Sequence, residues 1–262
     1  MAEITAAMVK ALREETGQGM MECKKALQDA NGDVEAARDL LRKKGLATAE
    51  KKAARVAKEG LIAIAATQGS AAMVEVNCET DFCARNDEFK KMMEKVAGLA
   101  AQAPDGDVPA SGEITGAVQA CFNKIGEKMG YRRGVKITAP TVGTYVHHNG
   151  KVAVVLGIAG VISDETLNDL CMHIAFADPM GVSSNDIPAE VVEKERKFAT
   201  EQAVESGKPA QIVEKMVEGK IRKFLADHAL LEQPFVKDEK QPVKNILGSA
   251  KVTAFARFAV GQ

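Results

Sequence analysis

The five cysteines are the residues of this 262-residue chain with the widest range of possible chemistry. Cys78 and Cys83 form a C-x4-C pair, and Cys171 lies two residues before His173. A zinc site needs about four ligands, and residues two apart on a helix rarely face the same metal. An odd number of scattered cysteines is typical of free thiols in a reducing compartment. We therefore predict buried free thiols, and neither a metal site nor a cofactor.

Known catalytic motifs are missing from the sequence. There is no G-x-x-x-x-G-K-S/T, H-E-x-x-H or G-x-S-x-G pattern, and Gly17-Gln18-Gly19 lacks the third glycine of a dinucleotide loop. His147 and His148 lie at a predicted hairpin turn, where histidines are more often solvated than catalytic. Cys83 lies near a helix start, where the dipole favours a thiolate, but no general base is evident. We predict no catalytic residues and no enzyme, with a thiol enzyme acting through Cys83 as the weaker alternative.

The stretch from Asn77 to Phe89, N-C-E-T-D-F-C-A-R-N-D-E-F, places an acid and an aromatic side chain where a turn is expected. It follows a predicted strand at 72–76 and precedes a predicted helix at 87–97. Phe82 could pack under that helix while Asp81 serves as a cap, as most aromatics pack in cores. Alternatively, Phe82 could be an exposed anchor of the kind that dominates protein interfaces. Residue properties alone leave both interpretations open.

Composition and charge narrow the class of protein. The net charge is −1, with 27% charged and 46% apolar residues, whereas nucleic-acid binders usually carry a surplus of Lys and Arg. The basic run from Lys51 to Lys58 keeps RNA binding as an alternative, although a solvated linker is the preferred interpretation. Residues 1–5 lack the regions of a signal peptide, and no apolar run reaches the ~20 residues that span a membrane. We predict a cytoplasmic protein without a membrane partner or direct nucleic-acid binding.

The periodicity of apolar residues predicts an α+β protein in several parts. Three short helices form a module over 1–46; Thr5 and Asp33 cap the first and third, and Gly45 ends the third. A linker over 47–59 follows. Strand, turn, strand and helix then occur twice, with strands at 61–65, 73–76, 141–147 and 152–158 and helices at 87–97 and 164–177. A further helix is predicted over 113–129.

This repeat indicates a weak internal duplication, with antiparallel sheets in two core subdomains. Subdomain N covers 60–140, and subdomain C covers 141–184 and 228–262. The apolar pattern of residues 185–227 predicts a protruding antiparallel helical hairpin, or coiled coil, which is broken at Ser206-Gly207-Lys208-Pro209. A short helix at 243–247 and a strand at 252–260, which rejoins subdomain C, complete the chain.

Several long segments resemble the bacterial elongation factor Ts family, in register over essentially the whole chain. They include MAEITAAMVKALREETGQGMMECKKAL at the start, EVNCETDFCARNDEF, IGEKMGYRR, SGKPAQIVEKMVEGKIRKF and VTAFARFAVG. The resemblance implies that the first module is ubiquitin-associated-like. An adaptor that uses this module alone is an alternative, but it leaves the rest of the chain unexplained. The chain stops at Gly261-Gln262, where longer family members continue into a C-terminal helix, so we expect that contact to be absent.

The resemblance implies guanine-nucleotide exchange on elongation factor Tu, which the protein would bind both with GDP and nucleotide-free. It places Thr80, Asp81, Phe82 and Cys83 in the segment that dislodges Mg²⁺, with Phe82 as a wedge and Asp81 bonding beside it. Cys83 replaces the family's usual valine. The other partner contacts that it implies are Arg13, Met20 and Met21 in the first module and Ile125, Gly126 and His147 in the core.

Overall fold

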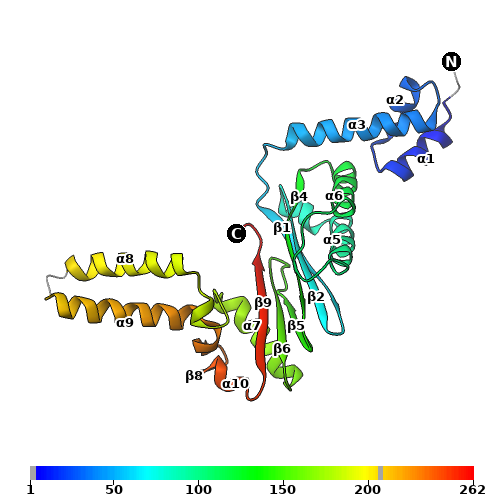
Figure 1. Ribbon diagram of the computed structural model, residues 1–262. Coiled ribbons are helices and arrows are strands. Elements are labelled where there is room, and N and C mark those ends of the chain that lie inside the picture. The colour runs from blue at the N-terminus through cyan, green and yellow to red at the C-terminus, as the bar shows by residue number, and fades with distance from the viewer. Residues whose placement is uncertain (1–3, 206–208) are drawn as a thin grey trace.

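The computed structural model describes residues 4–205 and 209–262, which fold into an α+β protein (Figure 1). A helical module lies at one end, and a helical hairpin projects away from the opposite side of a central core built on sheets. All of the named strands pair antiparallel. The predicted fold class is therefore confirmed, while the predicted domain boundaries remain a proposal.

The N-terminal module consists of α1 (Ala6–Thr16), α2 (Met20–Asp29) and the first part of α3 (Val34–Lys52). The Thr5 hydroxyl caps α1 by accepting a hydrogen bond from the backbone N–H of Met8, and Gly17 ends that helix in a left-handed conformation. The three helices bury a small apolar core of their own, made of Val9, Leu12, Cys23, Ala26, Leu27, Ala37 and Leu41.

Helix α3 does not stop at Gly45, and that prediction is wrong. The helix continues to Lys52 and so extends into the segment predicted as a linker. Gly45 is buried, and a Cβ atom at this position would lie 2.7 Å from the Asn123 side-chain oxygen. The glycine thus permits close approach to α6 (Gly112–Ile125), and it does not end the helix.

Two sheets form the core. The larger has the strand order β1-β2-β4-β3, and the smaller has the order β5-β6-β9. Their bounds are β1 (Glu59–Thr67), β2 (Ser70–Cys78), β3 (Gly106–Asp107), β4 (Met129–Thr138), β5 (Thr141–Val146), β6 (Val152–Ala159) and β9 (Lys251–Ala259). Both predicted hairpins are confirmed, and β9 rejoins β6 as expected. In each sheet the second hairpin strand pairs with a strand from later in the chain, which supports the predicted duplication.

The inner faces of the two sheets pack on each other, and helices cover the outer faces. Successive side chains of a strand point to opposite faces, so β2 is buried almost throughout. Its Ala72, Val74 and Val76 face a core shared with α5 (Asp87–Ala100) and α6, whereas Met73 faces the other sheet. On the far side, β6 packs in the same way against α7 (Asp164–Ala177). The central hairpin strands are therefore apolar on both faces.

The predictions for the core helices were right for α5 and α7, and wrong for the end of α6. We expected that helix to reach Met129, but it ends at Ile125. Gly126 follows with a φ of 80° and donates its N–H to the carbonyl of Phe122. Met129 already belongs to β4. A left-handed glycine therefore ends the helix although the apolar pattern continues.

The projecting hairpin consists of α8 (Ala189–Glu205) and α9 (Ala210–His228), which confirms the predicted pair of helices (Figure 1). The predicted break at 206–208 lies outside the described residues. The two helices bury Ala199, Ala203, Val217 and Ile221 between them. In sequence, η1 (Ser184–Asp186) precedes the hairpin. The elements that follow it, before β9, are η2 (Leu230–Glu232), β7 (Pro234–Phe235), β8 (Asp238–Pro242) and α10 (Val243–Ile246).

A buried carboxylate fixes the end of the chain to the larger sheet. Glu75 on β2 has no exposed surface, and its Oε2 lies 2.8 Å from Nε of Arg133. Its Oε1 accepts hydrogen bonds from Asn77 Nδ2 and from the backbone N–H of Gly261, at 3.0 and 3.1 Å. Arg133 also lies over the ring of Phe258 on β9, 4.3 Å from its centroid. One ion pair therefore connects β2, β4 and β9.

His173 is buried at the base of the helical hairpin, and its imidazole is neutral there. Nδ1 of His173 accepts the backbone N–H of Val236, so Nε2 carries the proton toward Gln233 Oε1, 3.0 Å away. Burial lowers the pKa of His173, although the bond to Gln233 opposes this shift. The folded state therefore binds fewer protons than the unfolded state below about pH 6.5.

We expect the free energy of unfolding to fall as the pH drops below about 6.5, with His173 contributing up to about 1.4 kcal/mol per pH unit. Urea unfolding at several pH values would measure this slope. The variant His173→Gln, which does not titrate, should show a shallower slope over the same interval. An identical slope in both proteins would contradict the assignment.

Candidate partner-binding site

Phe82 lies on the outside of the protein. It is the second residue of α4 (Asp81–Arg85), a short helix between β2 and α5, and 79% of its surface is exposed. The interpretation in which Phe82 packs under the following helix is therefore wrong. The next two residues, Cys83 and Ala84, are buried and attach the short helix to the core. The result is an exposed aromatic ring on a firmly seated turn.

The hydroxyl group of Thr80 fixes this turn with two hydrogen bonds, one accepted and one donated. The oxygen accepts the backbone N–H of Cys83 at 3.1 Å, which caps α4. The same hydroxyl donates to Oε2 of Glu127 at 2.9 Å, in the loop between α6 and β4. Thr80 thus positions Phe82 relative to the end of α6.

Replacing Thr80 by alanine removes both bonds, and we expect a loss of about 1 kcal/mol in the free energy of unfolding. Thr80→Ser keeps the hydroxyl group and should retain most of that stability. Urea denaturation of the two variants beside the parent protein would measure the difference. Equal losses in both variants would show that the methyl group, and not the hydroxyl, matters.

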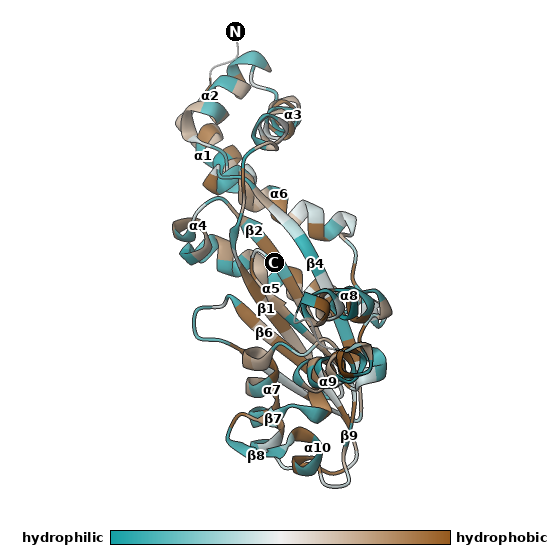
Figure 2. Ribbon diagram, turned by 90° about the vertical axis from the view of Figure 1, so that its left-hand side faces the viewer, coloured by the Kyte–Doolittle hydropathy of each residue, from teal (hydrophilic) through white to brown (hydrophobic). Residues whose placement is uncertain are grey.

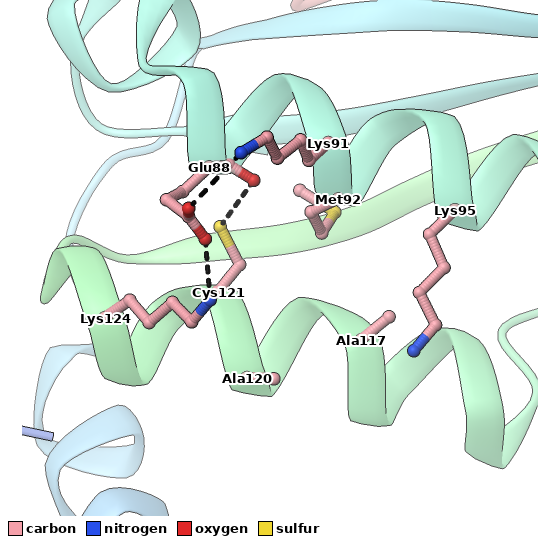
Figure 3. Close-up of a pocket in the computed structure, with 8 residues that line it drawn as sticks. All are labelled: Glu88, Lys91, Met92, Lys95, Ala117, Ala120, Cys121 and Lys124. Atoms are coloured by element: carbon pink, nitrogen blue, oxygen red, sulfur yellow. Dashed lines mark hydrogen bonds and ion pairs between the residues drawn. The ribbon is translucent and has the colours of Figure 1, made fainter. Parts of the chain in front are cut away.

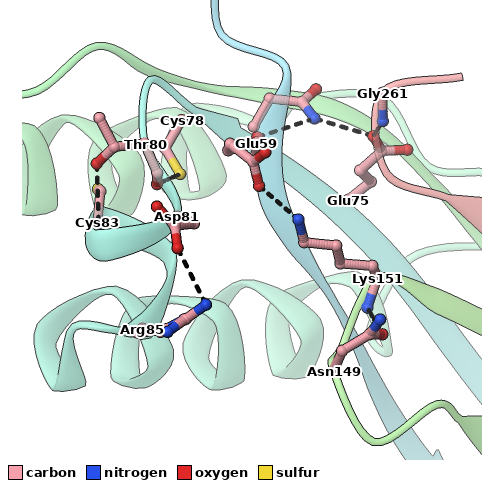
Figure 4. A network of polar contacts seen from close by, with 11 residues as sticks. Glu59, Glu75, Cys78, Thr80, Asp81, Cys83, Arg85, Asn149, Lys151 and Gly261 are labelled. Carbon is pink, nitrogen blue, oxygen red and sulfur yellow. Dashed lines mark hydrogen bonds and ion pairs between the residues drawn. The ribbon is translucent and has the colours of Figure 1, made fainter.

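Asp81 faces a hollow beside Phe82 rather than the core. Its carboxylate pairs with Arg85 at 3.0 Å, one turn along α4 (Figure 4). The hollow measures about 510 Å³ and is lined by Gly60, Leu61, Asp81, Ala84, Arg85, Lys90, His148, Asn149, Gly150 and Lys151. The turn between β5 and β6 therefore adjoins α4, although some sixty residues separate them in sequence.

The thiols near this turn are structural. All five cysteines are free and buried, as predicted. A hydrogen bond shared with Cys83, together with burial, raises the pKa of Cys78, whose thiol also donates to the Thr80 carbonyl at 3.2 Å. The same bond lowers the pKa of Cys83, and burial opposes it. Cys83 is only 2% exposed, which does not favour the thiol-enzyme alternative.

The other predicted core contacts surround the same region. Ile125 and Gly126 are the last residue of α6 and its cap, next to the Glu127 that binds Thr80. His147 begins the β5–β6 turn, half-buried, with Nδ1 2.8 Å from the Tyr145 hydroxyl. Ile125 and Gly126 thus lie next to the residue that binds Thr80, and His147 precedes the turn residues that line the hollow with Asp81. That these three residues contact a partner stays a prediction.

The predicted contacts of the N-terminal module lie on its surface. Arg13 is exposed, and Met20 and Met21 are 47% and 73% exposed at the start of α2. The preceding turn approaches the core, since a Cβ atom on Gly17 would lie 2.6 Å from the Lys124 side chain of α6. In Figure 2, α2, α1 and α4 follow one another down one side of the molecule. The helices that carry Arg13, the exposed methionines and Phe82 thus follow one another along one side of the molecule.

A second hollow lies between α5 and α6 on the outer face of the core (Figure 3). Its lining is Glu88, Lys91, Met92, Lys95, Ala117, Ala120, Cys121 and Lys124. Glu88 is paired with Lys124 at 2.6 Å, and this lysine lowers the pKa of the carboxyl group. Burial raises the pKa of Cys121 to about 12, which keeps its thiol protonated. This lining does not provide an activated nucleophile with a base.

Glu79 and Lys128 belong to the site, but no pattern in the sequence pointed to either of them. Glu79 binds the backbone N–H of Lys128 at 2.6 Å and the guanidinium of Arg55 at 3.2 Å. Hydrogen bonds across about fifty residues leave no local pattern, so only the fold reveals them. Lys52 and Arg55 are engaged within the protein, which does not favour the alternative in which the run from Lys51 to Lys58 binds RNA.

The described residues offer neither a metal site nor a membrane-spanning helix. Within residues 4–205 and 209–262, no group of three or more His, Cys, Asp or Glu side chains is arranged to hold a metal ion. Cys171 packs in the core of the smaller sheet, whereas Cys78 and Cys83 pack in that of the larger one. No helix in the described part of the chain is long and apolar enough to cross a membrane.

The fold and the site define a class of protein, an α+β scaffold that presents an exposed aromatic residue on a capped turn. A family model described as Elongation factor TS matches residues 79–262. Proteins called elongation factor Ts are similar over 99% of this chain and 92% of their own length, at 44% identity in Thioalkalivibrio sulfidiphilus and 45% in Hydrogenovibrio crunogenus. The relative from Nitrosomonas eutropha is 46% identical. The chain belongs to the elongation factor Ts family, whose role is in translation elongation.

Proposed function

We propose that this protein is a guanine-nucleotide exchange factor for elongation factor Tu and acts in the cytoplasm. The observation that carries the proposal is the exposed ring of Phe82 beside Asp81, on a turn that Thr80 caps and the core anchors. Family membership supports the same role. On this proposal the protein binds its partner and transforms no substrate, so it needs no catalytic group.

The proposed action of the turn is to disturb the Mg²⁺ site of the partner. Mg²⁺ requires near-ideal octahedral geometry and bridges nucleotide phosphates to a GTPase, so a small shift of its ligands releases it. Phe82 would enter between helices of the GTPase, and Asp81 would exchange its bond to Arg85 for one to the partner. A rigid turn suits this task because an ordered wedge loses little conformational entropy on binding.

Binding energy must also be coupled to nucleotide release. A nucleotide held with a nanomolar dissociation constant represents about 12 kcal/mol. The protein does not have to supply that amount, because it only needs a higher affinity for the nucleotide-free partner than for the loaded one. The exposed methionines of the N-terminal module and the Phe82 turn would provide two separated contacts for this purpose.

Titration of the protein against elongation factor Tu would test the proposal. We expect tight binding to the nucleotide-free partner, and a dissociation constant that rises as GDP is added. By reciprocity, the protein should weaken GDP binding by the same factor. Equal affinity for the two forms, or no binding to either, would overturn the proposal.

A further inference from the structure

The N-terminal module is tied to the Phe82 turn through one loop of the core. Lys128, in the loop between α6 and β4, points its ammonium group at the segment that joins α3 to β1. The Nζ atom donates to the carbonyls of Ala53 and Arg55 at 2.6 and 2.5 Å. Bonds from a charged donor are stronger than those between neutral groups. The exposed connecting segment is therefore held to the core at its backbone.

The same loop also holds the Phe82 turn, which comprises residues 79–85, at its start. The backbone N–H of Lys128 donates to Glu79, and the preceding Glu127 accepts the hydroxyl of Thr80. Glu79 in turn pairs with Arg55 of the connecting segment. Three stretches that are distant in sequence thus meet at this loop: the connecting segment, the start of the Phe82 turn and the end of α6.

Helix α3 adds a further attachment to this place. The ammonium group of Lys52, the last residue of α3, donates to the carbonyl of Gly126 and lies over the ring of Phe122. Gly45 approaches Asn123 on the same side of α6. The module therefore rests on the last turns of α6, immediately before the loop that contains Lys128.

We propose that Lys128 is a positioning residue, which fixes the N-terminal module relative to Phe82 so that both contact the partner at once. This inference rests on the proposed function for its effect on binding. Two contacts on one rigid frame reinforce each other through a high effective concentration, and this gain disappears when the frame becomes flexible. On this proposal Lys128 does not contact the partner itself and acts only by holding the connecting segment.

Lys128→Met tests the proposal selectively, because it removes the ammonium group and keeps the backbone N–H bonded to Glu79. In the free protein, trypsin should cut after Arg55 about ten times faster, since the carbonyl of the scissile bond is no longer held. Cutting after Arg222 in α9 should stay at the parent rate and thus exclude general unfolding. Lys128→Arg, which can still donate to both carbonyls, should resemble the parent at both sites.

The exchange assay separates positioning from a direct role. With Lys128→Met, the concentration for half-maximal acceleration of GDP release should rise about tenfold, while the maximal rate stays unchanged. Unchanged cutting after Arg55, or an unchanged half-maximal concentration, would overturn the inference. A lower maximal rate would also overturn it, because Lys128 would then act on the Phe82 turn itself. Failure of the parent protein to accelerate release would instead reject the proposed function, and the proteolysis result would stand alone.

Discussion

Replacing Phe82 by alanine should reduce the acceleration of GDP release from elongation factor Tu by about 30-fold or more. An aromatic anchor at the centre of an interface typically contributes 2 kcal/mol or more, and each 1.4 kcal/mol corresponds to a factor of ten. The free energy of unfolding should change little, because the ring is 79% exposed in the free protein. Initial rates of release of fluorescent GDP, with urea unfolding in parallel, would measure both effects.

Phe176 on α7 provides a matched control, since it is 80% exposed and lies on a helix that packs on the smaller sheet, away from α4. Phe176→Ala removes the same surface and should leave the exchange rate at the parent value. If the two variants lost activity equally, a general loss of apolar surface would explain the result. The assignment of a wedge to Phe82 would then be wrong.

Replacing Glu75 by alanine should cost about 3 kcal/mol in the free energy of unfolding, the largest effect on stability that we expect. The change leaves Arg133 without its buried partner, and it also removes one acceptor of Asn77 and the acceptor of the Gly261 backbone N–H. An uncompensated buried group costs more than the intact pair contributes. Urea unfolding would measure the loss.

Glu59 provides the comparison for this effect. It belongs to the same sheet and pairs with Lys151 at 2.6 Å, but both side chains are more than a third exposed. Glu59→Ala should therefore cost at most about 1 kcal/mol. Similar losses in the two variants would show that burial does not determine the cost. Glu75→Gln, which keeps the shape and loses the charge, should lie between them.

Local signals in the sequence predicted most of the elements. Helix α7 has the bounds that were predicted, because Ser163 caps it and its apolar residues repeat at helical spacing. The Asn149-Gly150 turn and the two hairpins follow from equally local chemistry. Glycines were harder to interpret. Gly45 was expected to end a helix, but it is a packing position inside α3. Gly126, in contrast, ends α6 although the apolar pattern continues beyond it.

The site was only partly predictable for a related reason. The sequence indicated that Asp81 and Phe82 occupy a turn, but exposure is a property of the assembled fold, and 79% of Phe82 is exposed only because Cys83 and Ala84 take the inward positions. The bonds of Thr80 to Glu127 and of Glu79 to Lys128 join residues about fifty positions apart. No periodicity or motif encodes such pairs.

The proposed function requires that this protein accelerate the release of GDP from elongation factor Tu. Stopped-flow fluorescence would test it most directly, with labelled GDP on the partner, excess unlabelled GDP, and increasing amounts of the parent protein. We expect the release rate to rise with protein concentration and to reach a plateau far above the spontaneous rate. A release rate that stays at the spontaneous value at every concentration would contradict it.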